Sequence, residues 1–156
     1  MDDEQALTVC AGCGGRCCKG FPGSAFPEDF GGTREEILPQ LVWALSALTW
    51  VVDTYKGQRF VRPAYKGESQ GFGPSCAGDE CVFLKENGCE LNYMNRPKEC
   101  RHLKPLVVGG KFKCKTQFNK QKASAAWSAH DDVIREALAK VKLAQKSRNG
   151  LACKLP

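Results

Sequence analysis

Cysteine is the residue that most constrains what this chain can fold into. Four cysteines fall within a glycine-rich stretch of nine residues, CAGCGGRCC at 10–18, and 10 occur among the 156 residues of the chain. Such a density is typical of a disulfide framework in an oxidising compartment or of a metal site in a reducing one. The choice between disulfides and metal therefore decides how the rest of the sequence is interpreted.

The N-terminal segment favours the reducing compartment. A secretory signal needs a basic start, an apolar stretch and a cleavage site of small residues, whereas this chain begins Met-Asp-Asp-Glu. We therefore expect a cytoplasmic protein, with disulfides as the alternative if a mature secreted form has already lost its signal. The longest uncharged run, residues 37–52, is shorter than the roughly 20 residues that a membrane span needs, so we expect no membrane partner.

Apolar periodicity predicts a helix near each end of the chain. Thr33 and Glu36 form a capping box, and leucines then recur at three- and four-residue steps as far as Val52. The second predicted helix covers about 121–147. Its predicted buried face consists of Trp127, Ile134, Leu138 and Val141. In the first helix, the tryptophans at 43 and 50 are expected to pack as a second apolar stripe.

Between these helices the sequence predicts short hairpins. Residues 81–93 form one with their Asn-Gly pair in the turn, a helical turn after Pro97 carries Cys100, and a hairpin turning at a Gly-Gly pair carries Cys114. The predicted fold is α+β. We expect residues 1–156 to make one small metal-nucleated domain with short β-hairpins and a long helix near each end.

The spacing of the first cysteines is that of metal ligands. The two residues between Cys10 and Cys13 let one turn present two sulfurs to one metal. A redox CxxC motif is expected in a βαβ context, which is lacking here. Side chains of Cys17 and Cys18 would point to opposite sides of an extended stretch. We therefore expect them to serve different metal ions, or one to bind metal while the other packs.

Two segments resemble the YkgJ-type cysteine-cluster proteins, a family described as zinc- or iron-chelating with a CxxCxxCC signature. The matching stretches are CAGCGGRCC at 10–18 and CVFLKENGCELNYMNRPKECR at 81–101, and their order and spacing extend the likeness over 10–114. The first motif departs from the signature by one extra residue, since three residues precede the adjacent cysteines. The resemblance implies eight metal ligands, which are Cys10, Cys13, Cys17, Cys18, Cys81, Cys89, Cys100 and Cys114.

The remaining candidate residues have less specific surroundings. Cys76 and Cys153 match nothing in the family pattern, and we expect inert thiols there. His102 follows Cys100 closely and is expected to donate a hydrogen bond to a metal ligand, while His130 is expected in the core. For Arg96 and Arg101, beside Cys100, both tuning of the thiolates and a salt bridge remain open.

Three functions follow from these patterns. The first is a zinc- or iron-binding protein that holds metal in a polycysteine cluster for a structural, chelating or sensing role. The second is an iron–sulfur redox protein or a cluster-dependent enzyme subunit, although the spacing differs from the bacterial ferredoxin run. The third is a basic interaction module with structural zinc, which contacts nucleic acid or a partner protein through residues 96–122, where Glu99 is the sole acid. A solvated basic face is the simpler interpretation of that stretch.

No set of catalytic residues emerges from the sequence. There is no phosphate-binding loop and no HExxH motif, and two histidines leave little material for acid–base catalysis. An enzymatic activity is therefore not expected, beyond the cluster-dependent alternative.

Overall fold

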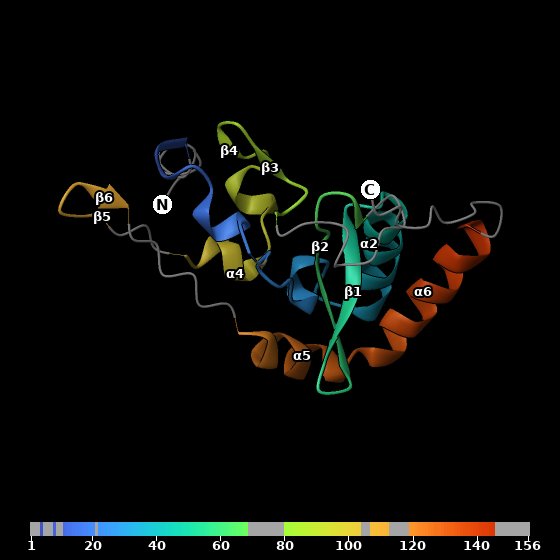
Figure 1. Ribbon diagram of the computed structural model, residues 1–156. Helices are drawn as coiled ribbons and strands as arrows, with labels where there is room; N and C mark the ends of the chain where they lie inside the picture. The colour runs from blue at the N-terminus through green and yellow to red at the C-terminus, as the bar shows by residue number, and fades with distance from the viewer. Residues whose placement is uncertain are drawn as a thin grey trace.

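The computed structural model describes residues 4, 8, 11–20, 22–68, 80–103, 107–112 and 119–145 (Figure 1). These residues form helices and short antiparallel hairpins, so the fold is α+β as predicted. The elements in chain order are η1 (Arg16–Cys18), η2 (Pro27–Asp29), α2 (Arg34–Ser46), β1 (Trp50–Tyr55), β2 (Gln58–Pro63), β3 (Leu84–Lys85), β4 (Gly88–Cys89), η4 (Tyr93–Asn95), α4 (Lys98–Arg101), β5 (Val107–Val108), β6 (Lys111–Phe112), α5 (Lys120–Ser128) and α6 (Asp131–Gln145).

A long hairpin and three helices make the larger part of the molecule, which we call the scaffold and which includes the loop 22–33. Strands β1 and β2 pair from Trp50–Pro63 to Tyr55–Gln58. Both residues of their turn have positive φ, 48° and 80°, which matches the twist of a two-residue hairpin. Helix α5 packs on this hairpin, and α2 and α6 pack on each other (Figure 1).

The scaffold is stabilised by a continuous apolar core. Ile37, Leu41, Phe60, Trp127 and Ile134 are fully buried within it. Burying each such side chain contributes about 1.5–3 kcal/mol. The indole Nε1 of Trp127 also donates to the carbonyl of residue 25 at 2.9 Å, which satisfies the polar atom of this largest buried ring.

The smaller part, which we call the cysteine lobe, consists of residues 11–20 and 80–103. The backbone N–H of Cys81 donates to the carbonyl of Cys18 at 2.7 Å, and a bridge between Lys19 and Glu80 lies next to it. Figure 1 shows the lobe on the opposite side of the view from α2 and α6. Residues 11–20 and 80–103, distant in sequence, therefore belong to one body.

The capping box that predicted the first long helix is confirmed, but the predicted extent of the helix is wrong. Thr33 and Glu36 form the box, and α2 ends at Ser46 because Leu48 has a φ of 63°. The sequence that follows is rich in β-branched and aromatic residues and forms β1. The expected tryptophan stripe therefore does not exist, and Trp43 is 69% exposed.

The predicted C-terminal helix is two helices, α5 and α6, and this correction has a local cause. The backbone N–H of His130 donates to the carbonyl of Trp127, and α6 begins at Asp131 with two acids in its first turn, which favour a new helix start. Trp127, Ile134 and Val141 are buried as predicted, while Leu138 is half-buried. His130 is half-buried with its ring edge-on to that of Trp127. Residues 146–147 lie outside the described part.

Both short hairpins are present. In the first, Leu84 pairs with Cys89 and Lys85 with Gly88, so the turn lies one residue earlier than predicted. In the second, the predicted turn at the Gly-Gly pair is confirmed, and both glycines have positive φ. No helix in the described ranges has the length and apolar character needed to cross a membrane.

Candidate metal centre

Five cysteines from separate segments converge in the cysteine lobe. Cys17 and Cys18 lie on η1, Cys81 forms a β-bridge with Tyr65, Cys89 lies on β4 and Cys100 lies on α4. The thiol of Cys18 interacts with those of Cys17, Cys81 and Cys89, and the same three thiols act electrostatically on Cys100. The chain thus brings the adjacent cysteines of the first motif together with the three cysteines of the second motif.

The turn η1 points both of its sulfurs into this group, which corrects a sequence prediction. Cys17 and Cys18 are not extended, since the N–H of Cys18 donates to the carbonyl of Gly15 and the two Sγ atoms lie 3.9 Å apart. Gly15 permits this turn because its φ is 72° and because a Cβ there would overlap the side chain of Leu84. The two adjacent cysteines can therefore serve one site.

Hydrogen bonds between the thiols shift their pKa values in opposite directions. The bonds with Cys17, Cys81 and Cys89 raise the pKa of Cys18. The bond with Cys18 lowers the pKa of Cys17, and the bond with Cys18 is also the largest cause that lowers the pKa of Cys89 to about 6. Cys17 and Cys89 are accordingly the thiols best prepared to become thiolates, the form that binds metal.

The two arginines that flank Cys100 have different roles. Arg96 is buried, its Nε donates to the carbonyl of residue 91 at 3.0 Å, and its charge lowers the pKa of both Cys17 and Cys89. Arg101 forms a salt bridge to Asp29, with 2.6 Å between Nη2 and Oδ1. Arg101 therefore forms the salt bridge of one interpretation, while Arg96 acts on the thiols of Cys17 and Cys89 through its charge.

Cys100 is held from outside the lobe by the loop at 22–24. Burial raises the pKa of its thiol, while a hydrogen bond from the N–H of Gly23 opposes that effect. The neighbouring Glu99 accepts from the N–H of Ser24 through Oε2 and from the N–H of Asn119 through Oε1, both at 2.7 Å. One carboxylate thus joins α4 to two separate segments of the scaffold.

Asp29 makes a second attachment of the same kind. Its Oδ2 accepts from the N–H of Phe26 and from the N–H of Lys98 at 2.8 and 2.9 Å, while Oδ1 pairs with Arg101. Sequence reasoning did not single out Asp29 or Glu99 as site residues. The position of Glu99 as the sole acid within the basic stretch 96–122 was an available signal for one of them.

Some predicted ligands are not placed in this group. Cys10 and Cys114 lie outside the described residues, as do Cys76 and Cys153. Cys13 is half-buried in the helical residues 11–13 that precede η1, and His102 is exposed at the end of α4. Within the described ranges, no three His, Cys, Asp or Glu side chains have the arrangement of a metal-ligand set. The converging thiols are therefore neighbours without coordination geometry.

The donor chemistry of the group fits a thiophilic metal. The six described cysteines are free thiols, and the 3.9 Å between Cys17 and Cys18 is about twice the length of an S–S bond. Thiolate ligands favour zinc, copper(I) and iron–sulfur clusters over calcium or magnesium. Comparison of the chain with models of known families, with curated proteins and with solved structures finds no match.

Proposed function

We propose that this protein holds zinc or iron in a cluster of cysteine thiolates. The observation that carries the proposal is the convergence of Cys17, Cys18, Cys81, Cys89 and Cys100 from three segments of the chain. Five clustered cysteines contribute little to the stability of a fold by apolar burial, because each side chain is small. A shared metal that all of them ligate accounts for their convergence.

The surroundings of the thiols support this proposal. A cluster of thiolates carries negative charge, and the buried guanidinium of Arg96 lies where it compensates that charge for Cys17 and Cys89. Zinc usually takes four ligands in a closed structural site. The five converging thiols, together with the implied ligands Cys10, Cys13 and Cys114, supply more sulfurs than one such site needs. The set suits either two zinc ions or a polynuclear iron centre.

The test is metal analysis of protein purified without oxygen. We expect metal to copurify in at least equimolar amount and to be lost from Cys89→Ser and Cys100→Ser. Cys153→Ser is the control, because this cysteine lies outside both motifs, and it should keep its metal. Colourless protein with zinc would assign a structural or chelating site. Brown protein with iron and acid-labile sulfide would assign the iron–sulfur class.

Two results would overturn the proposal. One is reduced, folded protein that contains no metal and does not take up added zinc or iron under anaerobic conditions. The other is protein that is folded only when oxidised, with the cysteines of the two motifs paired in disulfides. Mass spectrometry of the alkylated protein, before and after reduction, distinguishes these two results.

A further inference from the structure

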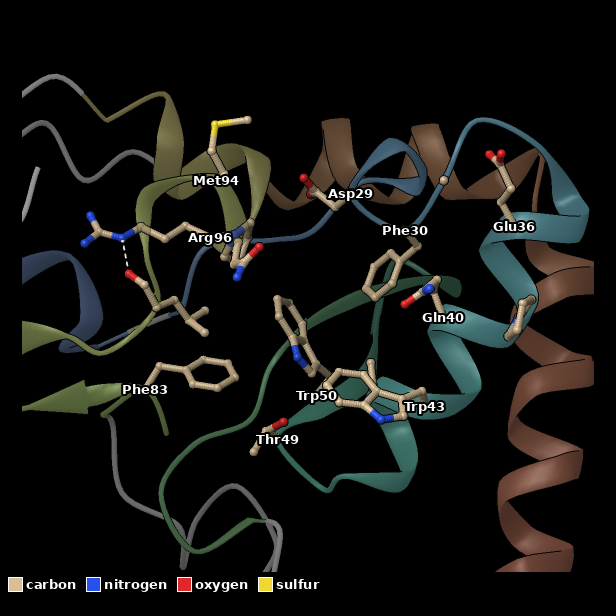
Figure 2. Close-up of a pocket in the computed structure, with 16 residues that line it drawn as sticks. Asp29, Phe30, Glu36, Gln40, Trp43, Thr49, Trp50, Phe83, Met94 and Arg96 are labelled. Atoms are coloured by element: carbon tan, nitrogen blue, oxygen red, sulfur yellow. Dashed lines mark hydrogen bonds between the residues drawn. The ribbon is translucent and has the colours of Figure 1, made fainter. Parts of the chain in front are cut away.

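A cavity of about 670 Å³ lies between α2 and the cysteine lobe (Figure 2). This volume falls within the range of pockets that hold small organic molecules. Its apolar lining is contributed by the scaffold on one side and by the lobe on the other, through Phe30, Trp43, Trp50, Phe83, Leu91 and Met94. Of its lining residues, the metal proposal uses Arg96 alone.

Three aromatic rings form a continuous wall of the cavity. The ring centroids of Phe30 and Trp50 lie 5.8 Å apart with the planes nearly perpendicular, and those of Trp50 and Phe83 lie 5.6 Å apart. Figure 2 shows Trp43 and Gln40 extending from α2 on the same side as these rings. Phe83 is itself buried, so the half-buried rings of Phe30 and Trp50 offer the aromatic surface, and such rings attract a further ring in stacked or edge-on arrangements.

The exposed apolar side chains gather at this cavity. Among the described residues the exposed large hydrophobic side chains are Trp43, Met94 and Val108, and the first two line the cavity from opposite sides. Trp43 is 69% exposed and Met94 is 66% exposed. Single exposed apolar residues are common, but two at the rim of one aromatic cavity indicate surface that a ligand covers.

The charged groups around the cavity already have partners within the protein. The carboxylate of Asp29 accepts two backbone N–H groups and pairs with Arg101, and that of Glu36 accepts the N–H groups of residues 32 and 33. Figure 2 shows the guanidinium of Arg96 directed away from Trp50. The other polar side chains of the lining, Gln40, Thr49 and Asn95, are neutral.

We infer that this cavity binds a neutral, planar aromatic ring that stacks between Trp43 and the half-buried ring of Trp50, with Phe83 buried behind Trp50. The amide and hydroxyl groups of the lining supply hydrogen bonds to the heteroatoms of such a ring. Phe83 also packs in the apolar cluster that contains Cys18 and Cys81. A bound ring would accordingly lie one side-chain layer from the converging thiols.

The test is titration of the full chain, labelled with 5-fluorotryptophan, with indole, observed by ¹⁹F NMR. The label reports separately on Trp43, Trp50 and Trp127, the three tryptophans of the chain. Saturable shifts are expected at Trp43 and Trp50 and smaller ones at Trp127, whose ring is buried in the core. Indole-3-acetate and tryptamine, which add a negative or a positive charge to the same ring, should bind more weakly than indole.

Two matched variants complete the test. Met94→Ala removes an exposed side chain from the rim and should weaken indole binding by about fivefold, whereas Val108→Ala removes an exposed side chain elsewhere and should leave it unchanged. Trp43→Ala should weaken indole binding at least as much as Met94→Ala does. In this variant the ¹⁹F signal of Trp50 reports the binding. The inference is overturned if indole gives no saturable shift, if it binds Trp43→Ala as tightly as the parent, or if tryptamine binds more tightly than indole.

Discussion

The scaffold and the cysteine lobe are stabilised by different means although they belong to one chain. The scaffold buries large apolar side chains, among them Trp127, Phe60 and Leu41, at 0% exposure. In the lobe, the buried apolar cluster consists of Cys18, Cys81, Phe83 and Leu84. Half of that cluster is cysteine, and the rest of the lobe is held by turns and polar contacts.

This difference indicates which region can fold without help. Large apolar side chains contribute most of the stability of a small domain, whereas a cysteine buries little area. The lobe is joined to the scaffold by contacts such as Trp50 with Phe83 and Glu99 with Ser24, and residues 80–82 pair through their backbone with residues 64–66, which follow β2. The scaffold is therefore expected to be stable by itself, and the lobe to depend on whatever its thiols bind.

Removal of the metal that we propose for the lobe should have the largest effect, and it should act on the lobe and not on the scaffold. A structural zinc site contributes about 10 kcal/mol or more to folding, so a chelator added under reducing, anaerobic conditions should unfold the lobe alone. Hydrogen exchange followed by mass spectrometry should show loss of protection in residues 11–20 and 80–103. Helices α2, α5 and α6 should keep theirs.

Cysteine variants provide the control for this experiment. Cys89→Ser should reproduce the effect of the chelator without any chelator present, and Cys153→Ser should behave like the parent. If stripped and reduced protein protects the lobe as well as the loaded protein does, the thiols do not hold the lobe together and the comparison fails.

Trp127→Ala should destabilise the scaffold and leave the metal content of the lobe unchanged, whereas a chelator should unfold the lobe and leave the scaffold folded. The ring of Trp127 is fully buried and its Nε1 is hydrogen-bonded, so the substitution should lower the free energy of unfolding by about 3–5 kcal/mol. Urea denaturation monitored by circular dichroism measures the loss. Metal content of the folded fraction should not change.

Trp43→Ala is the matched control for that substitution. The same residue type is 69% exposed there, so the free energy of unfolding should change by no more than about 0.5 kcal/mol. Loss of metal from Trp127→Ala that remains folded would show that the core of the scaffold also shapes the metal centre.

The sequence predicted caps and turns correctly, but it did not predict the residues at which the helices end. The capping box at Thr33 and Glu36 and the glycine turn of the second hairpin depend on a few neighbouring residues, and both are present. The end of α2 was not predictable from the pattern, because the uncharged run 37–52 suits a buried helix as well as a helix followed by a strand. The break before Asp131 has no proline or glycine to announce it.

The same contrast applies to the candidate site. Cysteine spacing and the family resemblance selected the five thiols that the structure brings together, but the short turn at Cys17 and Cys18 was missed. The residues that hold Cys100 were also missed. Glu99 and Ser24 are 75 positions apart in the sequence, and motif spacing or periodicity cannot predict a hydrogen bond between residues so far apart.

Loss of the Glu99 carboxylate should loosen the junction of the two regions by an intermediate amount. Glu99→Ala leaves the buried N–H of Ser24 without its acceptor, which costs about 1–3 kcal/mol. Faster amide exchange at Ser24 and Asn119, measured by NMR, and faster release of metal are expected. Glu99→Gln keeps an acceptor oxygen and should show a smaller effect.

Glu90→Ala is the control for this junction. Glu90 lies in the same lobe but is exposed, and its ion pair with Lys85 spans 3.4 Å at the surface. Its loss should change stability by no more than about 0.5 kcal/mol. Equal effects of the two alanine variants on amide exchange at Ser24 and Asn119 would show that Glu99 does not specifically join α4 to the scaffold.

The smallest expected effect is a change in the pH at which the lobe releases its metal. The pKa of Cys89 is lowered from an ordinary 9.0 to about 6, first by the hydrogen bond with Cys18 and further by Arg96. A lowered pKa in the folded state stabilises that state above the ordinary pKa of the thiol, and this stabilisation is lost as the pH falls through about 6. Metal competes with protons for the thiolate, so release should occur below about pH 6.

Arg96→Gln removes a positive charge beside Cys17 and Cys89, and the midpoint of release should move upward by less than about one pH unit. Arg101→Gln removes the same charge from a side chain that pairs with Asp29, and it should leave the midpoint in place. Metal retained after ultrafiltration at a series of pH values measures both variants. A midpoint that moves equally in the two would mean that Arg96 acts through the general charge of the lobe and not on the thiols it adjoins.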